Sequence, residues 1–99
     1  MKIEKFLPVG SVVLLKGAQK KIMIIGFCPV PKNDEKKIFD YSGCLYPEGL
    51  ISSDKTLLFN HDQIEKIYHL GLIDEEEQTF KEKLIEVIKE EKTKNKKNN

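Results

Sequence analysis

Hydrophobic residues form short runs in the first 60 positions and recur at helical spacing toward the C-terminal end. Residues 11–16 and 21–28 are rich in β-branched and large aliphatic side chains, and the short link 17–20 between them favours a hairpin. Because both runs are continuous and do not alternate, we expect both faces of these two strands to be covered. Two prolines and several charged residues then predict an exposed loop over residues 29–37.

Two further strands are predicted after this loop. Residues 38–46 alternate between apolar and polar character, which predicts a third strand, and Gly43 is expected to mark a bulge or bend within it. Pro47 and Gly49 have the spacing of a turn that leaves a strand. The apolar residues 57–59 predict a short closing strand.

The remaining periodic segments predict two helices. Asn60 followed by Gln63 is a capping-box pair for a first helix that ends at Gly71. Asp74 followed by Glu77 repeats this pattern for a second helix. The first helix is expected to turn three residues inward, namely Ile64, Ile67 and Tyr68. The second helix carries an apolar stripe, which either covers the sheet or docks on a partner helix. The stripe consists of Phe80, Leu84, Ile85, Val87 and Ile88.

These elements together predict an α+β fold. We expect a small, strongly curved antiparallel sheet of about four or five strands, followed by two C-terminal helices. A chain of 99 residues is long enough for one domain with a modest core. The prediction is therefore a single domain over residues 1–92 and a disordered Lys/Asn-rich tail over residues 93–99.

Charge and cysteine content narrow the possible functions. The formal net charge is +1, and all 17 basic residues are lysines. Without arginine the chain lacks the planar group that reads guanine edges, which disfavours sequence-specific nucleic-acid binding. The N-terminal residues lack the pattern of a secretory leader, and no apolar run is long enough to span a membrane. We therefore expect a cytoplasmic protein in which Cys28 and Cys44 stay reduced.

The side chains suggest no catalytic or metal site. Cys44 and His61 are the only candidates for a nucleophile and a base, and spacing identifies no third group to orient them. His61 and His69 lie eight residues apart, about 12 Å along a helix, and cannot share an ion by themselves. The dispersed glycines form no phosphate-binding loop. We expect no enzymatic activity, no cofactor and no metal.

Four stretches of the sequence, residues 7–17, 21–26, 40–49 and 59–61, resemble a known family in order and spacing. It is a family of small proteins of unknown function encoded in type VIIb (ESAT-6-like) secretion loci of low-GC Gram-positive bacteria, commonly near LXG-domain toxins. The resemblance extends from about Leu7 to Leu84. Its structural signature positions are Pro8, Gly10, Gly17, Gly26, Gly43, Gly49, Asn60 and His61.

The resemblance implies a non-enzymatic cytoplasmic accessory factor, a chaperone or targeting factor, that binds an LXG-domain toxin for export. The expected contact surface combines the strand around Tyr41 with the apolar face of the second helix. Its candidate residues are Tyr41, Tyr46, Pro47, Glu48, Phe80, Leu84 and Ile88. Three alternatives stay open: an immunity protein for the toxin's effector domain, a component of the secretion machinery, and a small nucleic-acid-binding module that stacks bases on aromatic rings.

Overall fold

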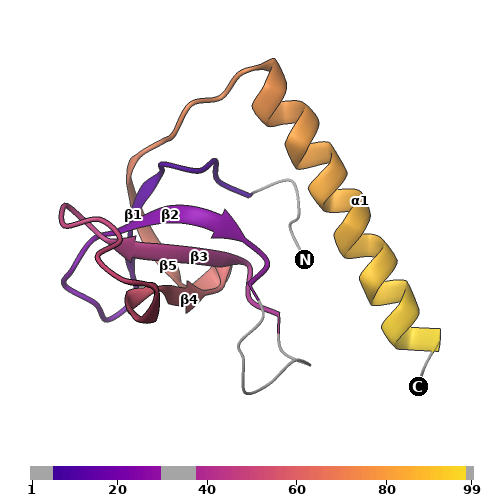
Figure 1. Cartoon of the computed structure of the whole chain (residues 1–99), viewed down its shortest axis with the longest axis horizontal. Coiled ribbons are helices and arrows are strands. Elements are labelled where there is room, and N and C mark those ends of the chain that lie inside the picture. The colour runs from indigo at the N-terminus through magenta and orange to yellow at the C-terminus, as the bar shows by residue number, and fades with distance from the viewer. Residues whose placement is uncertain (1–5, 30–37, 98–99) are drawn as a thin grey trace. The chain divides into compact units, whose positions relative to one another are not determined.

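The computed structural model describes residues 6–29 and 38–97, with side chains up to residue 90, so most of the predicted loop 29–37 lies outside the described residues. The chain forms two compact units: a sheet unit, residues 7–72, and a helical unit, which contains Phe6 and residues 73–97 among those described. The elements, shown in Figure 1, are β1 (Val12–Leu15), β2 (Ile22–Phe27), β3 (Tyr41–Leu45), β4 (Leu57–Phe59), β5 (Ile64–His69) and α1 (Glu75–Lys97).

The sheet unit is built around one antiparallel sheet with the strand order β4-β3-β2-β1-β5. β1 pairs with β2, β2 with β3 and β3 with β4, and β5 returns to pair with the free edge of β1. The α+β class is confirmed. The prediction of a strong curvature is wrong. The sheet does not curl up on itself, because β4 and β5 remain at opposite edges and do not pair with each other among the described residues.

The predicted hairpin is confirmed, with Val12 opposite Met23 and Val13 opposite Ile22. Burial alternates along β2, where Ile22 and Ile24 are buried while Met23 is half-buried. Both faces were expected to be covered because the apolar run is continuous, and one face is in fact covered more deeply than the other. The core of the sheet unit consists of Val12, Val13, Ile22, Ile24, Tyr41, Cys44 and Phe59.

The bulge expected at Gly43 lies in the neighbouring strand. One extra residue of β2, Ile25, interrupts the pairing opposite Gly43 and Ser42. Gly43 itself is required by close packing, since a Cβ there would lie 2.6 Å from Ile22 Cγ2 and 2.9 Å from the Met23 carbonyl oxygen. Its absent side chain lets β2 and β3 pack tightly over the core.

The prediction of a first helix after Asn60 is wrong. Asn60 and Gln63 do form the capping box, with Gln63 Oε1 accepting the Asn60 N–H at 2.8 Å, but it closes a single 3₁₀ turn over His61–Gln63. The chain then extends as β5. The reason is long-range, because pairing with β1 satisfies backbone groups that would otherwise lie on an open sheet edge.

Gly71, expected to end that helix, has a different role. Its N–H donates to Ser11 Oγ at 3.0 Å, and the added Cβ of any other residue would overlap the Val9 carbonyl oxygen. Two segments of the chain therefore cross here at backbone contact, which only glycine permits.

The second predicted helix is confirmed as α1. Asp74 Oδ1 accepts the Glu77 N–H at 2.9 Å as the predicted N-cap, and Glu77 pairs with Lys81 at 3.1 Å one turn later. The helix continues to Lys97, so residues 93–97, predicted to be disordered, are helical, while residues 98–99 lie outside the described part. The single domain over residues 1–92 stays a prediction. Within the described chain, no helix combines the length and apolar character required to cross a membrane.

Candidate functional site

Tyr41, predicted to contact a partner, is fully buried and stacks on Phe59 with 5.2 Å between ring centroids. Its hydroxyl accepts the Leu7 N–H at 3.1 Å and lies 2.6 Å from His61 Nδ1. The Tyr41 O–H is thus placed to donate to His61 Nδ1, which corresponds to the tautomer that carries its proton on Nε2. Tyr41 joins three segments of the sheet unit and does not belong to the contact surface.

Burial, more than the negative charge of Asp40, raises the pKa of Tyr41 to about 12. The hydroxyl therefore keeps its proton at neutral pH. Asp40 reinforces the same region, since its Oδ2 accepts the His61 N–H at 2.8 Å and its own N–H donates to Asn60 Oδ1 at 3.0 Å. The signature residues Asn60 and His61 thus fix the 3₁₀ turn against the start of β3.

The remaining signature positions also have structural roles. Pro8 is buried, and a Cβ on Gly26 would lie 2.7 Å from Ser42 Oγ. The backbone φ angle is positive at Gly10 (93°), Gly17 (78°) and Gly49 (80°). Cys28 and Cys44 are free thiols, and Cys44 is buried. No group of three or more His, Cys, Asp or Glu residues in the described segments is arranged to hold a metal ion.

The turn after β3 presents three of the predicted contact residues. Tyr46, Pro47 and Glu48 are all exposed, and the Tyr46–Pro47 peptide bond is cis. Glu48 pairs with Lys20 at 2.8 Å, and this hydrogen bond from Lys20 lowers the pKa of the Glu48 carboxyl group. The Tyr46 side chain is 42% exposed and faces a pocket.

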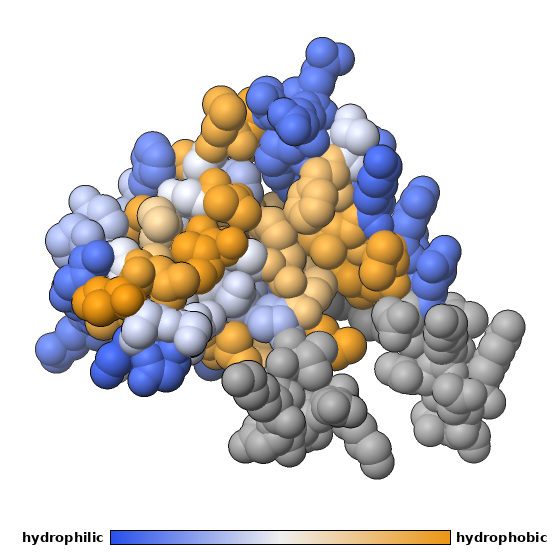
Figure 2. All heavy atoms as spheres, in the orientation of Figure 1, coloured by the Kyte–Doolittle hydropathy of each residue, from blue (hydrophilic) through white to orange (hydrophobic). Residues whose placement is uncertain are grey.

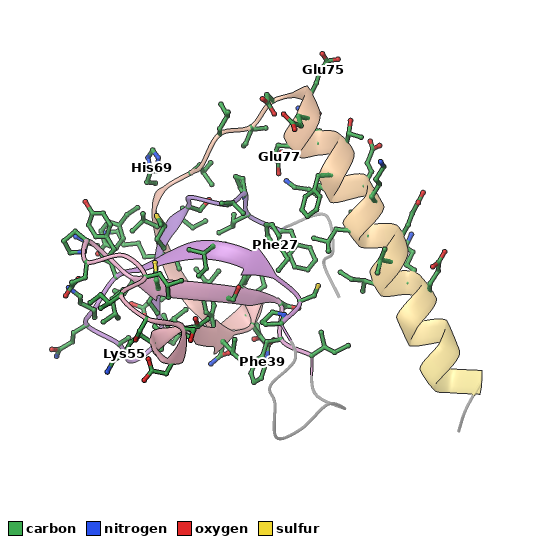
Figure 3. The ribbon with its side chains drawn as sticks, in the orientation of Figure 1. Phe27, Phe39, Lys55, His69, Glu75 and Glu77 are labelled. Carbon is green, nitrogen blue, oxygen red and sulfur yellow. The ribbon has the colours of Figure 1, made fainter. Side chains whose placement is uncertain are left out.

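This pocket is shallow, has a volume of about 380 Å³ and is lined by Val12, Lys21, Tyr46, Tyr68 and His69. Its lining residues come from β1, from the residue before β2, from the turn after β3 and from β5, so segments far apart in the sequence meet there. His69 projects from the end of β5 in Figure 3. We call these five residues, together with Lys66, the Lys21 pocket.

Cations surround the aromatic wall of the Lys21 pocket. Lys21 Nζ lies 4.6 Å from the ring centroid of Tyr68 and 6.0 Å from that of Tyr46. Lys66 Nζ lies 4.8 Å from the Tyr68 centroid. Two ammonium groups therefore share one ring, an arrangement in which each cation is attracted to the electron-rich ring face.

A β-bulge positions Tyr68 in this pocket. Val12 pairs with His69 and Val13 pairs with Ile67, so Tyr68 is an extra residue without a partner in β1. A bulge redirects the side chain that it carries and is frequent at sheet edges and functional sites. Sequence reasoning missed this residue because it placed Tyr68 on the inner face of a helix. The available signal was the pair of β-branched isoleucines beside an aromatic residue in segment 64–69.

A second surface feature is the apolar segment that begins in β5. Ile67 is 47% exposed, Leu70 48% and Leu72 76%. Figure 2 shows apolar side chains reaching the surface of the sheet unit among hydrophilic ones. We call residues 67–72 the apolar segment. Sequence reasoning also missed this surface, since it assigned Ile67 to a buried position.

The helical unit carries the predicted apolar stripe. Phe80 is 50% exposed and Val87 54%, while Leu84 and Ile88 are half-buried. Glu75 and Glu77 project in different directions from the first turn of α1 (Figure 3). The stripe is thus present on α1 with the spacing that the sequence predicts.

The fold and these surfaces define a small α+β protein whose open five-stranded sheet presents a lysine-tyrosine pocket. Residues 6–80 match a family model described as a domain of unknown function (DUF4176), and the chain belongs to this family. The match spans the whole sheet and the first turns of α1. No curated protein and no solved structure matches the chain.

Proposed function

We propose that this protein is a non-enzymatic cytoplasmic accessory factor that binds an LXG-domain toxin for export by a type VIIb secretion system. The observation that carries the binding role is the exposed apolar segment, residues 67–72, in which Leu72 is 76% exposed. Concentrated apolar exposure of this kind marks a protein-binding surface. The partner is proposed from the resemblance of residues 7–84 to proteins encoded near such toxins.

The partner is expected to contact side chains and not to add a strand to the sheet. Besides the bulge at Tyr68, β5 has a second one at Glu65, because Leu14 pairs with Lys66 and Leu15 with Ile64. Bulges and an edge lysine oppose strand addition. LXG regions are long helical segments, and helices with exposed apolar stripes suit a side-chain surface.

The apolar stripe of α1 is the second surface of the proposal. Phe80, Leu84 and Ile88 repeat at helical spacing on one element, which suits packing against a partner helix. Tyr46, Pro47 and Glu48 stay within the proposed contact residues because they are exposed, whereas Tyr41 is removed because it is buried.

The test is co-expression of the full chain with the LXG protein encoded nearest to it, followed by size exclusion at low and high salt. We expect a complex that resists salt and requires only the LXG region, because apolar contacts are little screened by ions. The double variant Leu70→Ser with Leu72→Ser should lose the complex. Ile51→Ser is the matched control, since Ile51 is 71% exposed but lies outside the apolar segment.

Each variant must first show wild-type circular dichroism and thermal unfolding. A folded double variant that binds as well as the Ile51→Ser control would remove the apolar segment from the contact. A complex that requires the toxin's C-terminal domain would instead identify an immunity protein. Absence of any complex, with both proteins folded, would contradict the proposal and favour a component of the secretion machinery.

A further inference from the structure

We propose that the Lys21 pocket binds a carboxylate side chain of an acidic protein segment. This inference rests on the proposed function only for the identity of the partner. The cavity of about 380 Å³ combines the charge of Lys21 with an apolar lining, and Lys66 adds a second positive charge beside its Tyr68 wall. That combination matches an aspartate or glutamate side chain, which carries its charge at the end of an apolar stem.

Among the described residues, no carboxylate forms an ion pair with Lys21 or Lys66. In the described part of the sheet unit, the ion pair within 4.0 Å joins Lys20 to Glu48. Lys21 and Lys66 both approach the Tyr68 ring instead, at 4.6 and 4.8 Å from its centroid. A ring face attracts an ammonium group without removing its charge, so both cations keep donors available for an anion.

The pocket wall favours a side chain over a bare ion. Val12 is 7% exposed and forms the apolar part, while the rings of Tyr46 and Tyr68 are 42% and 45% exposed. These rings offer contact area to methylene groups beside a carboxylate. The pocket also adjoins the apolar segment along the chain, because Tyr68 belongs to both. A partner segment with an acidic residue beside apolar residues would therefore satisfy both surfaces.

A phosphate of a nucleic acid fits the pocket less well. Nucleic-acid affinity depends on several phosphate contacts along a basic surface, and arginine, the residue suited to bidentate phosphate binding, is absent from this chain. Here two lysines converge on one ring, and Lys20, which precedes Lys21 in the sequence, is paired with Glu48. One carboxylate at a single position agrees better with this distribution.

The experiment is an NMR titration of the ¹⁵N-labelled full chain with a short peptide of alternating leucine and glutamate. The control peptide replaces each glutamate with glutamine. We expect saturable shifts at the amides of Lys21, Tyr68 and His69 with the glutamate peptide only. Lys21→Met should weaken its binding about tenfold, as should Lys66→Met, because each removes a charged hydrogen-bond donor. Lys20→Met makes the same change in net charge outside the pocket and should leave binding within about twofold.

Three results would overturn the carboxylate assignment. The first is that the glutamine peptide binds as tightly as the glutamate peptide. The second is that Lys20→Met weakens binding as much as Lys21→Met does. The third is that oligothymidylate shifts the same amide signals and binds more tightly than the glutamate peptide, which would identify a phosphate site. The peptide and toxin experiments separate the two proposals. Peptide binding without any toxin complex would contradict the proposed function and leave the pocket assignment standing. A toxin complex insensitive to Lys21→Met would exclude the pocket from that interface.

Discussion

At the residue scale, a single hydroxyl group connects the segment before β1, the strand β3 and the turn before β5. Tyr41→Phe keeps the buried ring but leaves the Leu7 N–H and His61 Nδ1 without this partner. We expect the free energy of unfolding to fall by about 1–2 kcal/mol at pH 7, since buried polar groups would lose their hydrogen bonds. Urea denaturation measures this change. Tyr46→Phe is the control, because the Tyr46 ring is 42% exposed and its hydroxyl loss should have little effect.

The contribution of Tyr41 to the free energy of unfolding should also depend on pH, and the Tyr41→Phe variant tests this. The pKa of Tyr41 is raised from 10.0 to about 12 in the folded state, so the phenol contributes stability that is complete below pH 10 and is lost as pH rises toward 12. The stability difference between wild type and Tyr41→Phe should therefore shrink by about 1 kcal/mol between pH 8 and pH 11. A constant difference over this interval would show that Tyr41 titrates alike in the folded and unfolded chains.

Residue types in the sequence predicted which positions shape the fold better than they predicted which positions are exposed to a partner. The spacing of Pro47 and Gly49 predicts a turn, and Gly49 does adopt a positive φ in the turn after β3. Tyr41 and Tyr46 belong to the same short motif, yet one is fully buried and the other is 42% exposed. Their difference depends on which neighbouring strands cover each ring, and this is decided by pairing between distant segments.

At the scale of elements, two capping-box sequence patterns with the same spacing lead to different structures. Asn60 with Gln63 begins one 3₁₀ turn, whereas Asp74 with Glu77 begins a helix that extends to Lys97. A capping box satisfies the first N–H groups and does not determine how far a helix continues. Glutamate, lysine and leucine after Glu77 favour helix, while isoleucine and tyrosine after Gln63 accept a strand once β1 offers an edge.

The start of α1 can be tested through its cap. Asp74→Ala removes the acceptor of the Glu77 N–H and should lower the stability of the helix by about 1 kcal/mol. The expected readout is fraying of the first turn, seen as Cα chemical shifts of residues 75–77 that move toward coil values. Asp74→Ser supplies another acceptor and should restore most of the helical shifts. Equal shifts in wild type and Asp74→Ala would mean that this cap does not stabilise the helix.

At the scale of the whole molecule, the site depends on strand order more than on any local motif. The sequence identified Tyr46 but not Lys21, Tyr68 or His69, because the Lys21 pocket exists only when β5 pairs with β1. Residues from β1 to β4 were predictable because each strand follows its partner closely along the chain. The return of β5 to β1 joins positions far apart in the chain, such as Val12 and His69. The residue types of segment 64–69 can indicate a strand, but nothing local indicates that its partner is β1.

Strand order also predicts how stability is distributed. β2 has partners on both sides, and the Ile24 N–H donates to the Ser11 carbonyl oxygen at 2.8 Å, whereas β5 is paired on one side and interrupted by two bulges. In native-state hydrogen exchange we expect the Ile24 amide to exchange most slowly and the paired amides of β5 to exchange faster through local opening. Each opening of β5 separates Tyr68 and His69 from Val12 and therefore destroys the Lys21 pocket.

Because opening of β5 destroys the Lys21 pocket, hydrogen exchange of the β5 amides tests both the local opening and the binding of the peptide to the pocket. The glutamate peptide binds only the closed form, so it should slow β5 exchange by the factor one plus the ratio of free peptide to Kd. Amides of α1 that exchange by their own local fraying should not respond. The glutamine peptide is the control and should leave β5 unchanged. If β5 exchanged as slowly as Ile24 before peptide was added, the pocket would open only with the whole sheet, and the peptide would slow β5 and Ile24 by equal factors.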